Sequence, residues 1–373
     1  MGDIPVDRLV GGDLLASLDA DSWVYFLCNV GDGDSQLVVL PLVEGRRKVI
    51  VIDAYTDKVV RLITELTNRG VLDGQEPDIA LVVATHPHQD HISNMPNLFR
   101  THGDRITEFW DPGYYHPIAA YTTLMKQLQD RRAEITYAQP TAGLRRWIGG
   151  TLVTVLSPAV GLRNRFDSYG TEINDSSISL RIDHPAARAT TRDDQGRLVE
   201  DGGPTSTLIL GGDAQTLSWS HVMVDFPYLP SSSTEAAKAI AAATGTKDLL
   251  NTDVVKVSHH GSKRGVNLEL MERFSASIVL VSSRSRTDST HGFPHLLTQE
   301  VIREVKEPIA TEVNQPERED DWKHQVYYTH DVDSEGTMLG TIAIVFRGEQ
   351  REIWRLGDKR LDPIDFGDAR RRI

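Results

Sequence analysis

The feature that most constrains this chain is an apolar run followed at once by side chains that bind metals. Residues 79–84 read Ile-Ala-Leu-Val-Val-Ala, and residues 85–91 read Thr-His-Pro-His-Gln-Asp-His. An apolar, β-branched run without polar alternation is typical of a strand buried on both faces. The sequence therefore predicts an α/β fold in which this polar loop leaves the C-terminal end of a central strand, where open α/β sheets place their sites.

The loop offers four potential metal ligands within six residues. Imidazole nitrogens and a carboxylate suit zinc or another borderline divalent metal, and ligands this close favour two ions on one loop. We expect His86 and His88 to hold a first metal ion, and Asp90 and His91 to face a second. The alternative is a polar loop whose histidine only caps a helix, which the preceding strand disfavours.

The His-x-His-x-Asp-His pattern of this loop resembles the metal loop of the metallo-β-lactamase superfamily. The resemblance implies a four-layer αββα sandwich with a metal site at one edge. Members of this superfamily hydrolyse lactams, thioesters, phosphodiesters and nucleic acids, so the resemblance alone does not name a substrate.

Three further stretches resemble the nuclease-like domain of ComEC-type DNA-uptake proteins, and together the likeness spans roughly residues 20–305. Residues 29–35, NVGDGDS, resemble its DVGQGDS signature, although a hairpin turn is the simpler interpretation of such a sequence. Residues 174–182 are similar to its NxxSLVLRI strand, and residues 253–262, DVVKVSHHGS, to its DVLKVPHHGS motif. The resemblance implies a nuclease-like metal site.

Two further strand ends carry residues that we expect to bind the metals. Residues 207–213 end a buried strand in Gly-Gly-Asp, and the resemblance implies that Asp213 bridges the two metals. After the strand of the 253–262 motif, we expect His259 to bind a metal, with His260 facing the cleft or supplying the ligand instead.

The third ligand of the first metal is less defined. Many members of the superfamily carry a histidine at the start of the 174–182 strand, and this chain has none there. We expect Asp175 to fill the position, because a carboxylate binds zinc better than the amide of Asn174. An Asx turn is the alternative, and His184, just past the strand, is another candidate.

Other polar residues have expected roles beside the metals. Asp53, at the end of the predicted strand 47–53, either orients a ligand or caps the following helix. With Asp90, we expect His260 and His295 to carry catalysis, the histidines by binding phosphate or protonating the leaving group. The stretch 290–297 resembles the ComEC-type sequence yGHPHpevl, with His295 kept and Phe293 at a histidine position.

Composition narrows the classes of function. The formal net charge of −13 disfavours a general nucleic-acid coating role. A local basic rim could still be formed by Lys256, Lys263, Arg264, Arg284 and Arg286. The single cysteine, Cys28, excludes an intrachain disulfide and a thiolate zinc site. Without a signal-like N-terminus or an apolar run of membrane-spanning length, we expect a cytoplasmic protein with no membrane partner.

These observations predict a metallo-β-lactamase-fold hydrolase domain over residues 1–306 and a C-terminal β extension over residues 307–373. In the extension, stretches 324–330, 338–346 and 350–356 are typical of an antiparallel meander. The predicted cofactors are two divalent ions, zinc first and manganese as the alternative. The predicted function is a phosphodiesterase or nuclease that uses a metal-bound hydroxide on nucleic acid or nucleotide. The alternatives are a lactamase, lactonase or thioesterase, and a non-catalytic module stabilised by metal.

Overall fold

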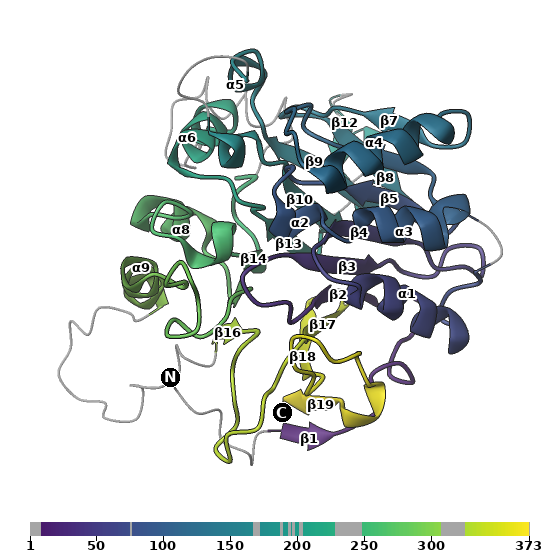
Figure 1. Cartoon of the computed structure of the whole chain (residues 1–373), viewed down its shortest axis with the longest axis vertical. Coiled ribbons are helices and arrows are strands. Elements are labelled where there is room, and N and C mark those ends of the chain that lie inside the picture. Colours follow the sequence, from purple (N-terminus) through teal and green to yellow (C-terminus); the bar gives the residue numbers. More distant parts are fainter. Residues whose placement is uncertain are drawn as a thin grey trace.

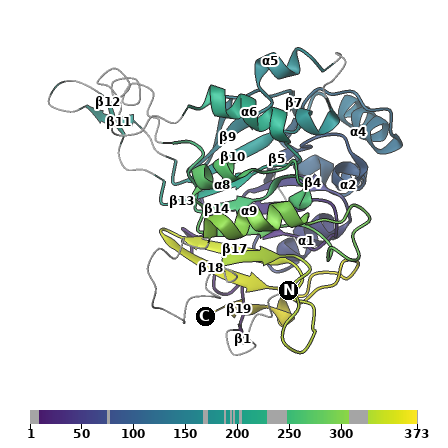
Figure 2. The same ribbon diagram turned by 90° about the vertical axis from the view of Figure 1, so that its left-hand side faces the viewer.

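The computed structural model describes residues 9–74, 77–166, 172–186, 189–192, 195, 198–200, 204–227, 248–306 and 325–372. These residues form two large β-sheets and one separate two-stranded sheet. The strands of the first sheet follow the order β1 (Leu9–Gly11), β19 (Arg370–Arg372), β18 (Gln350–Arg355), β17 (Ile342–Arg347), β2 (Trp23–Leu27), β3 (Ser35–Val39), β4 (Val49–Ala54), β5 (Ile79–Val83), β6 (Glu108–Trp110) and β7 (Thr136–Ala138). Those of the second follow the order β16 (Val326–Tyr328), β15 (Ile278–Val281), β14 (Val254–Lys256), β13 (Ser206–Leu210), β10 (Ser179–His184), β9 (Thr151–Ser157) and β8 (Arg145–Ile148). The third pairs β11 (Ala189–Arg192) with β12 (Leu198–Glu200), which stand away from the main body in Figure 2.

The helices lie on the two outer faces of the paired sheets. They are α1 (Lys58–Asn68), α2 (Gln89–Ile92), α3 (Met95–His102), α4 (Ala119–Asp130), α5 (Val160–Arg163), α6 (Thr216–Asp225), α8 (Leu268–Phe274) and α9 (Leu296–Lys306). Short 3-10 helices are η2 (Gly103–Arg105), η3 (Ile173–Ser176), η4 (Ser258–Gly261) and η6 (Phe366–Asp368). In Figure 1, α1, α3 and α4 cover the first sheet on the right, while α6, α8 and α9 cover the second on the left.

The layers follow from strands that bury side chains on both faces. Successive residues of a strand point to opposite faces, so in β2 the side chains of Val24 and Phe26 pack beneath the helices of the first sheet. The intervening Trp23, Tyr25 and Leu27 pack between the two sheets. A third apolar cluster lies between the second sheet and α6, α8 and α9. Three apolar layers among four layers of structure confirm the predicted αββα sandwich.

The parallel part of each sheet determines where the polar strand ends lie. Strands β4, β5, β6 and β7 run parallel in the first sheet, and β13, β14, β15 and β16 run parallel in the second. The segments that follow β5, β13 and β14 carry the predicted metal residues other than Asp175, and Asp53 lies near the end of β4. The fold thus gathers segments distant in sequence at one edge of the sandwich.

The C-terminal strands extend both sheets. The predicted antiparallel pairing is correct for β17 and β18, but it is wrong for β16, which pairs in parallel with β15. Helix α9 lies between β15 and β16 in the chain, and a helical crossover returns the chain in the same direction. Residues 317–321, which read Glu-Arg-Glu-Asp-Asp and are expected to be solvated, lie outside the described residues. No helix in the described part of the chain combines the length and apolarity needed to cross a bilayer.

Candidate metal centre

Four strand ends bring the polar side chains together. Asp53 is near the end of β4, and residues 85–91 follow β5 directly. From the second sheet, Asp213 follows β13, and His259 and His260 lie in η4 just after β14. The site is therefore built jointly by the two sheets.

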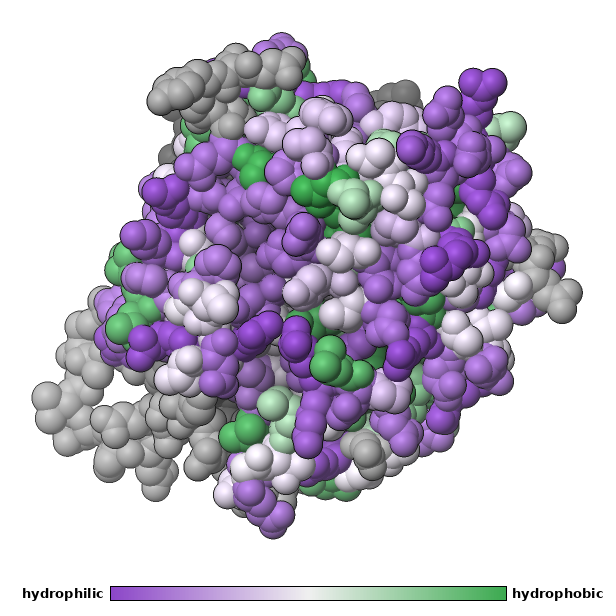
Figure 3. Space-filling model, in the orientation of Figure 1, coloured by the Kyte–Doolittle hydropathy of each residue, from purple (hydrophilic) through white to green (hydrophobic). Residues whose placement is uncertain are grey.

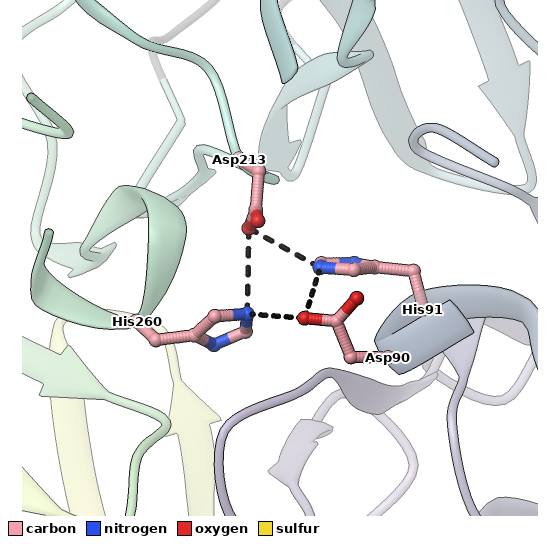
Figure 4. Close-up of side chains that lie close together, drawn as sticks. All are labelled: Asp90, His91, Asp213 and His260. Atoms are coloured by element: carbon pink, nitrogen blue, oxygen red, sulfur yellow. Dashed lines mark ion pairs between the residues drawn. The ribbon is translucent and has the colours of Figure 1, made fainter. Parts of the chain in front are cut away.

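One group of four side chains is compact enough to hold a divalent ion (Figure 4). The ligand atoms of Asp90, His91, Asp213 and His260 all lie within 4.8 Å of one another. Asp213 Oδ1 is 3.3 Å from His91 Nε2 and 3.6 Å from His260 Nε2, and Asp90 Oδ2 is 3.6 Å from His260 Nε2. Ligand atoms around tetrahedral zinc are about 3.4 Å apart at bond lengths of roughly 2.1 Å, so these distances fit a metal.

The hydrogen bonding of this group also fits a cation. His91 Nε2, His260 Nε2 and Asp213 Oδ1 are buried and have no hydrogen-bond partner among the described residues. Buried polar atoms are rarely left unpaired in folded proteins. Because all three atoms point into the cluster, a divalent ion there would satisfy all of them.

The two histidines of this group are oriented through their other ring nitrogens. His91 Nδ1–H donates to Asp53 Oδ2 at 2.7 Å, and His260 Nδ1–H donates to the carbonyl of Ser282 at 3.0 Å. Each bond fixes the tautomer that leaves Nε2 free to bind metal. Asp53 also accepts from the amide and hydroxyl of Thr85. Asp53 therefore supports a ligand, whereas the residue at the helix cap of α1 is Asp57.

The other predicted ligands lie on the opposite side of Asp213. His86 Nε2 is 3.0 Å from His88 Nδ1 and 3.8 Å from Asp213 Oδ2. His259 Nε2 is 3.7 Å from the same Oδ2. This side is not among the groups of described residues whose ligand atoms all lie within 4.8 Å of one another.

Protonation also differs between the two sides. Burial lowers the pKa values of His86, His88 and His259. Burial acts in the same direction on His91 and His260, but the Asp213 carboxylate, with Asp53 and Asp90, raises their pKa values above the ordinary range. Without metal, the Oδ1 side of Asp213 therefore stabilises positive charge, which is the electrostatic condition for binding a cation.

Several predicted residues are not drawn into the cluster. Asp175 Oδ1 accepts from Ser218 Oγ at 3.1 Å, and His184 Nδ1 lies 3.1 Å from Thr151 Oγ1. His295 Nδ1 accepts from the amide of Leu297. The reason for Asp175 is local: the 3-10 turn η3 presents its carboxylate to the hydroxyl group on α6.

Lys256 is a correction to the predicted basic rim. Its side chain is fully buried and pairs with the buried carboxylate of Asp34, a residue of the NVGDGDS motif that the sequence did not indicate as part of the site. Asp34 N donates to the carbonyl of Asp90, and Asp34 Oδ1 lies 3.8 Å from His260 Nδ1. The NVGDGDS motif was the available signal for Asp34. Because we interpreted the motif as a hairpin turn, we did not expect it to contact the metal loop.

Residues 41–162 match the family model described as Metallo-beta-lactamase superfamily. That stretch contains β4, β5 and the complete loop from Thr85 to His91. Over these residues the chain is similar to the metallo-β-lactamase superfamily, in agreement with its αββα fold. No curated protein sequence matches it.

Solved structures with detectable likeness have low identity. The metallo-beta-lactamase fold protein YhfI from Bacillus subtilis is 12% identical, covers 83% of this chain and 96% of its own, and has a TM-score of 0.38. Igni18, a metallo hydrolase from Ignicoccus hospitalis, is 13% identical over 87% of this chain and 99% of its own, with a TM-score of 0.38. A long form RNase Z from yeast is 12% identical over 71% of this chain and 38% of its own, with a TM-score of 0.37.

Proposed function

We propose that this chain is a metal-dependent phosphodiesterase or nuclease that hydrolyses nucleic acid or a nucleotide with two divalent ions. The observation that carries the proposal is the position of Asp213 between two sets of histidines. Its Oδ1 faces His91 and His260, and its Oδ2 faces His86. A carboxylate with one oxygen directed toward each set of histidines is suited to bridge the ions of a two-metal centre.

The residues divide the work of holding the ions. Asp90, His91 and His260 would bind one ion, His86 and His88 the other, and Asp213 would hold both at a fixed separation. When bound, two such ions supply an activated water and a Lewis acid at neutral pH. Zinc fits the His and Asp donor set, and manganese is the alternative.

The charge of the site supports an anionic substrate. Two divalent ions bring four positive charges, and Asp90 and Asp213 bring two negative ones, so about two positive charges remain. Asp175 is left out of this sum because it is not in the described groups of side chains that could hold a metal ion. Figure 3 shows mainly hydrophilic side chains on the face seen in Figure 1, with apolar ones in small scattered patches. The similarity of three motifs to the ComEC-type nuclease domain makes a phosphodiester our choice among anions.

The proton donor for the leaving group is assigned differently from the sequence-based expectation. His260 directs Nε2 toward Asp90 and Asp213, so we place it among the metal ligands. Protonation of the leaving group remains a prediction for His295, a half-buried residue on the loop before α9.

The test compares substrates and matched variants. Metal-loaded protein should cleave bis-p-nitrophenyl phosphate and labelled single- or double-stranded DNA or RNA, and a chelator should abolish the cleavage. His88→Ala should lose turnover, whereas His221→Ala, a half-buried histidine on α6, should retain it. Turnover of nitrocefin or a thioester without any phosphodiester cleavage would refute the proposal. Binding of both metals without hydrolysis of any substrate would indicate a non-catalytic module instead.

A further inference from the structure

We infer that the consecutive histidines His259 and His260 divide between the two metal positions, so that His259 supplies the third nitrogen of the first position. The inference rests on the proposed two-metal function and specifies how this chain replaces the histidine missing from the 174–182 strand. The first position is then His86, His88, His259 and the Oδ2 atom of Asp213.

Asp213 defines which ring belongs to which side. Its Oδ1 is 3.6 Å from His260 Nε2, and its Oδ2 is 3.7 Å from His259 Nε2. The distance to His259 matches the 3.8 Å between the same Oδ2 and His86 Nε2. Both are close to the separation of about 3.4 Å expected between ligands of one tetrahedral zinc ion. His86, His259 and Asp213 together are not among the described groups whose ligand atoms all lie within 4.8 Å of one another, so binding requires the two rings to approach each other.

The backbone of η4 is what separates two adjacent rings. Both residues are left-handed, with φ of 51° at His259 and 53° at His260. Such conformations are unfavourable for residues with a Cβ, and they persist where function requires them. The two ring planes are consequently nearly perpendicular, at 79°, with centroids 6.2 Å apart. The two adjacent rings can therefore face two different ions.

The main chain fixes His259 beside the shared carboxylate. Its amide donates to the carbonyl of Gly212, the residue immediately before Asp213, at 3.0 Å. The next turn is closed by Ser262 N, which donates to the His259 carbonyl at 2.7 Å. His259 Nδ1 is buried without a hydrogen-bond partner among the described residues. The main chain of His259 is thus held in place, and both nitrogens of its ring remain available.

The rival ligands are directed elsewhere or are chemically weaker. The carboxylate of Asp175 accepts from Ser218 and His184 lies beside Thr151, and neither is in the described groups of side chains that could hold a metal ion. Asn174 has a buried Oδ1 without a partner among the described residues. An amide oxygen is a poor ligand for zinc compared with imidazole, so Asn174 is the competing candidate that the experiment must exclude.

The experiment counts metals and reads their ligands with cobalt(II) alone as the probe. The full chain should bind two equivalents. His259→Ala should retain one tightly bound equivalent and weaken the other by more than about 100-fold, the upper end of what loss of a ligand's hydrogen-bond partner costs. His260→Ala should affect the other position, with a different visible spectrum. Asn174→Ala and His221→Ala should keep both equivalents.

A direct readout comes from replacing the ring by a thiolate. His259→Cys with cobalt(II) should show a thiolate-to-metal charge-transfer band in the near ultraviolet, which the native protein with its buried Cys28 and a His221→Cys control should lack. Retention of both equivalents at unchanged affinity by His259→Ala, or loss of one by Asn174→Ala, would overturn the inference. If His259→Ala loses one ion but the native protein cleaves no phosphodiester, the inference stands and the proposed function fails. If His259→Ala keeps both ions at unchanged affinity but the native protein cleaves a phosphodiester, the proposed function stands and the inference fails.

Discussion

The two sides of Asp213 hold their histidines by different means. On the Oδ1 side, His91 is anchored to Asp53 and His260 to the Ser282 carbonyl, and their side chains are 0% and 1% exposed. On the Oδ2 side, the side chain of His259 is 18% exposed and its Nδ1 has no hydrogen-bond partner among the described residues. In the proposed two-metal centre, the second position, on the Oδ1 side, would thus be assembled before metal arrives, whereas the first, on the Oδ2 side, would be completed by the metal. We expect the second position to bind more tightly once its histidines have lost their protons.

The largest effect should come from the residue that both sides share. Asp213→Asn keeps the shape of the side chain but replaces a carboxylate by a weakly ligating amide, so both metals and all phosphodiester turnover should be lost. Metal content measured by elemental analysis and turnover of bis-p-nitrophenyl phosphate check this. The control is Asp183→Asn, a buried aspartate that pairs with Arg181. Loss of only one metal would show that Asp213 does not bridge.

The next effect concerns the support beneath the second position. Lys256 and Asp34 form a fully buried pair, and Lys58 at the start of α1 forms another with Asp358. Removing one partner of a buried pair leaves an uncompensated charge and costs about 3–5 kcal/mol. Lys256→Met and Lys58→Met should therefore both lower the free energy of unfolding, as measured by urea denaturation.

Only the first of these variants should also weaken metal binding at the second position. Asp34 contacts the Asp90 carbonyl and lies near His260, whereas Asp358 binds the backbone and hydroxyl of Thr341. If both variants lose the same stability and bind metal with the same affinity, the Lys256–Asp34 pair supports only the fold and not the metal position.

A smaller effect should follow from changing one hydrogen bond. Asp53→Asn removes the charge that orients His91, and loss of such a partner typically costs 10–100-fold in metal affinity. The dissociation constant of the second position should rise by about that factor. That of the first should change less, because Asp53 reaches His86 only through the hydroxyl of Thr85. Competition with a chromogenic chelator measures both constants. Equal weakening of both would contradict the independence of the two sides.

The smallest effect is a difference in pH dependence. The raised pKa values of His91 and His260 extend their protonation to higher pH than for an ordinary histidine, so metal must displace protons there and affinity should rise with pH. The pKa values of His86, His88 and His259 are lowered, so their rings are uncharged at neutral pH and affinity is nearly independent of pH. Titration calorimetry in buffers of different ionisation enthalpy counts the released protons. Equal proton release at both positions would remove this distinction.

The sequence was most informative where a strand leads directly into a ligand. The apolar run before Thr85 and the one before Asp213 end at the C-terminal edge of parallel strands, and the structure brings the side chains that follow them together. A ligand at a strand end is positioned by the strand itself. For that reason sequence alone could place these residues near one another.

The sequence was least informative where a turn decides the direction of a side chain. Which of His259 and His260 faces which side depends on two left-handed residues, and no residue type before Gly261 signals that conformation. In η3 the turn likewise directs Asp175 toward Ser218. For β16, the pattern of apolar residues indicated a strand but not its neighbour, because alternation reports burial and not pairing.

The position of β17 has a consequence for how the chain reaches its native state. β17 pairs with β2 along five residues, so that Trp23 faces Phe346, more than three hundred positions later in the sequence. Until residues 342–347 have left the ribosome, the buried strand β2 has an open edge whose amide and carbonyl groups are unpaired. The pairing of β2 with β17 must therefore form late, because it joins two of the most widely separated segments in the chain. Until then the partly synthesised protein exposes an unpaired strand edge that is prone to aggregation and that chaperones would have to shield.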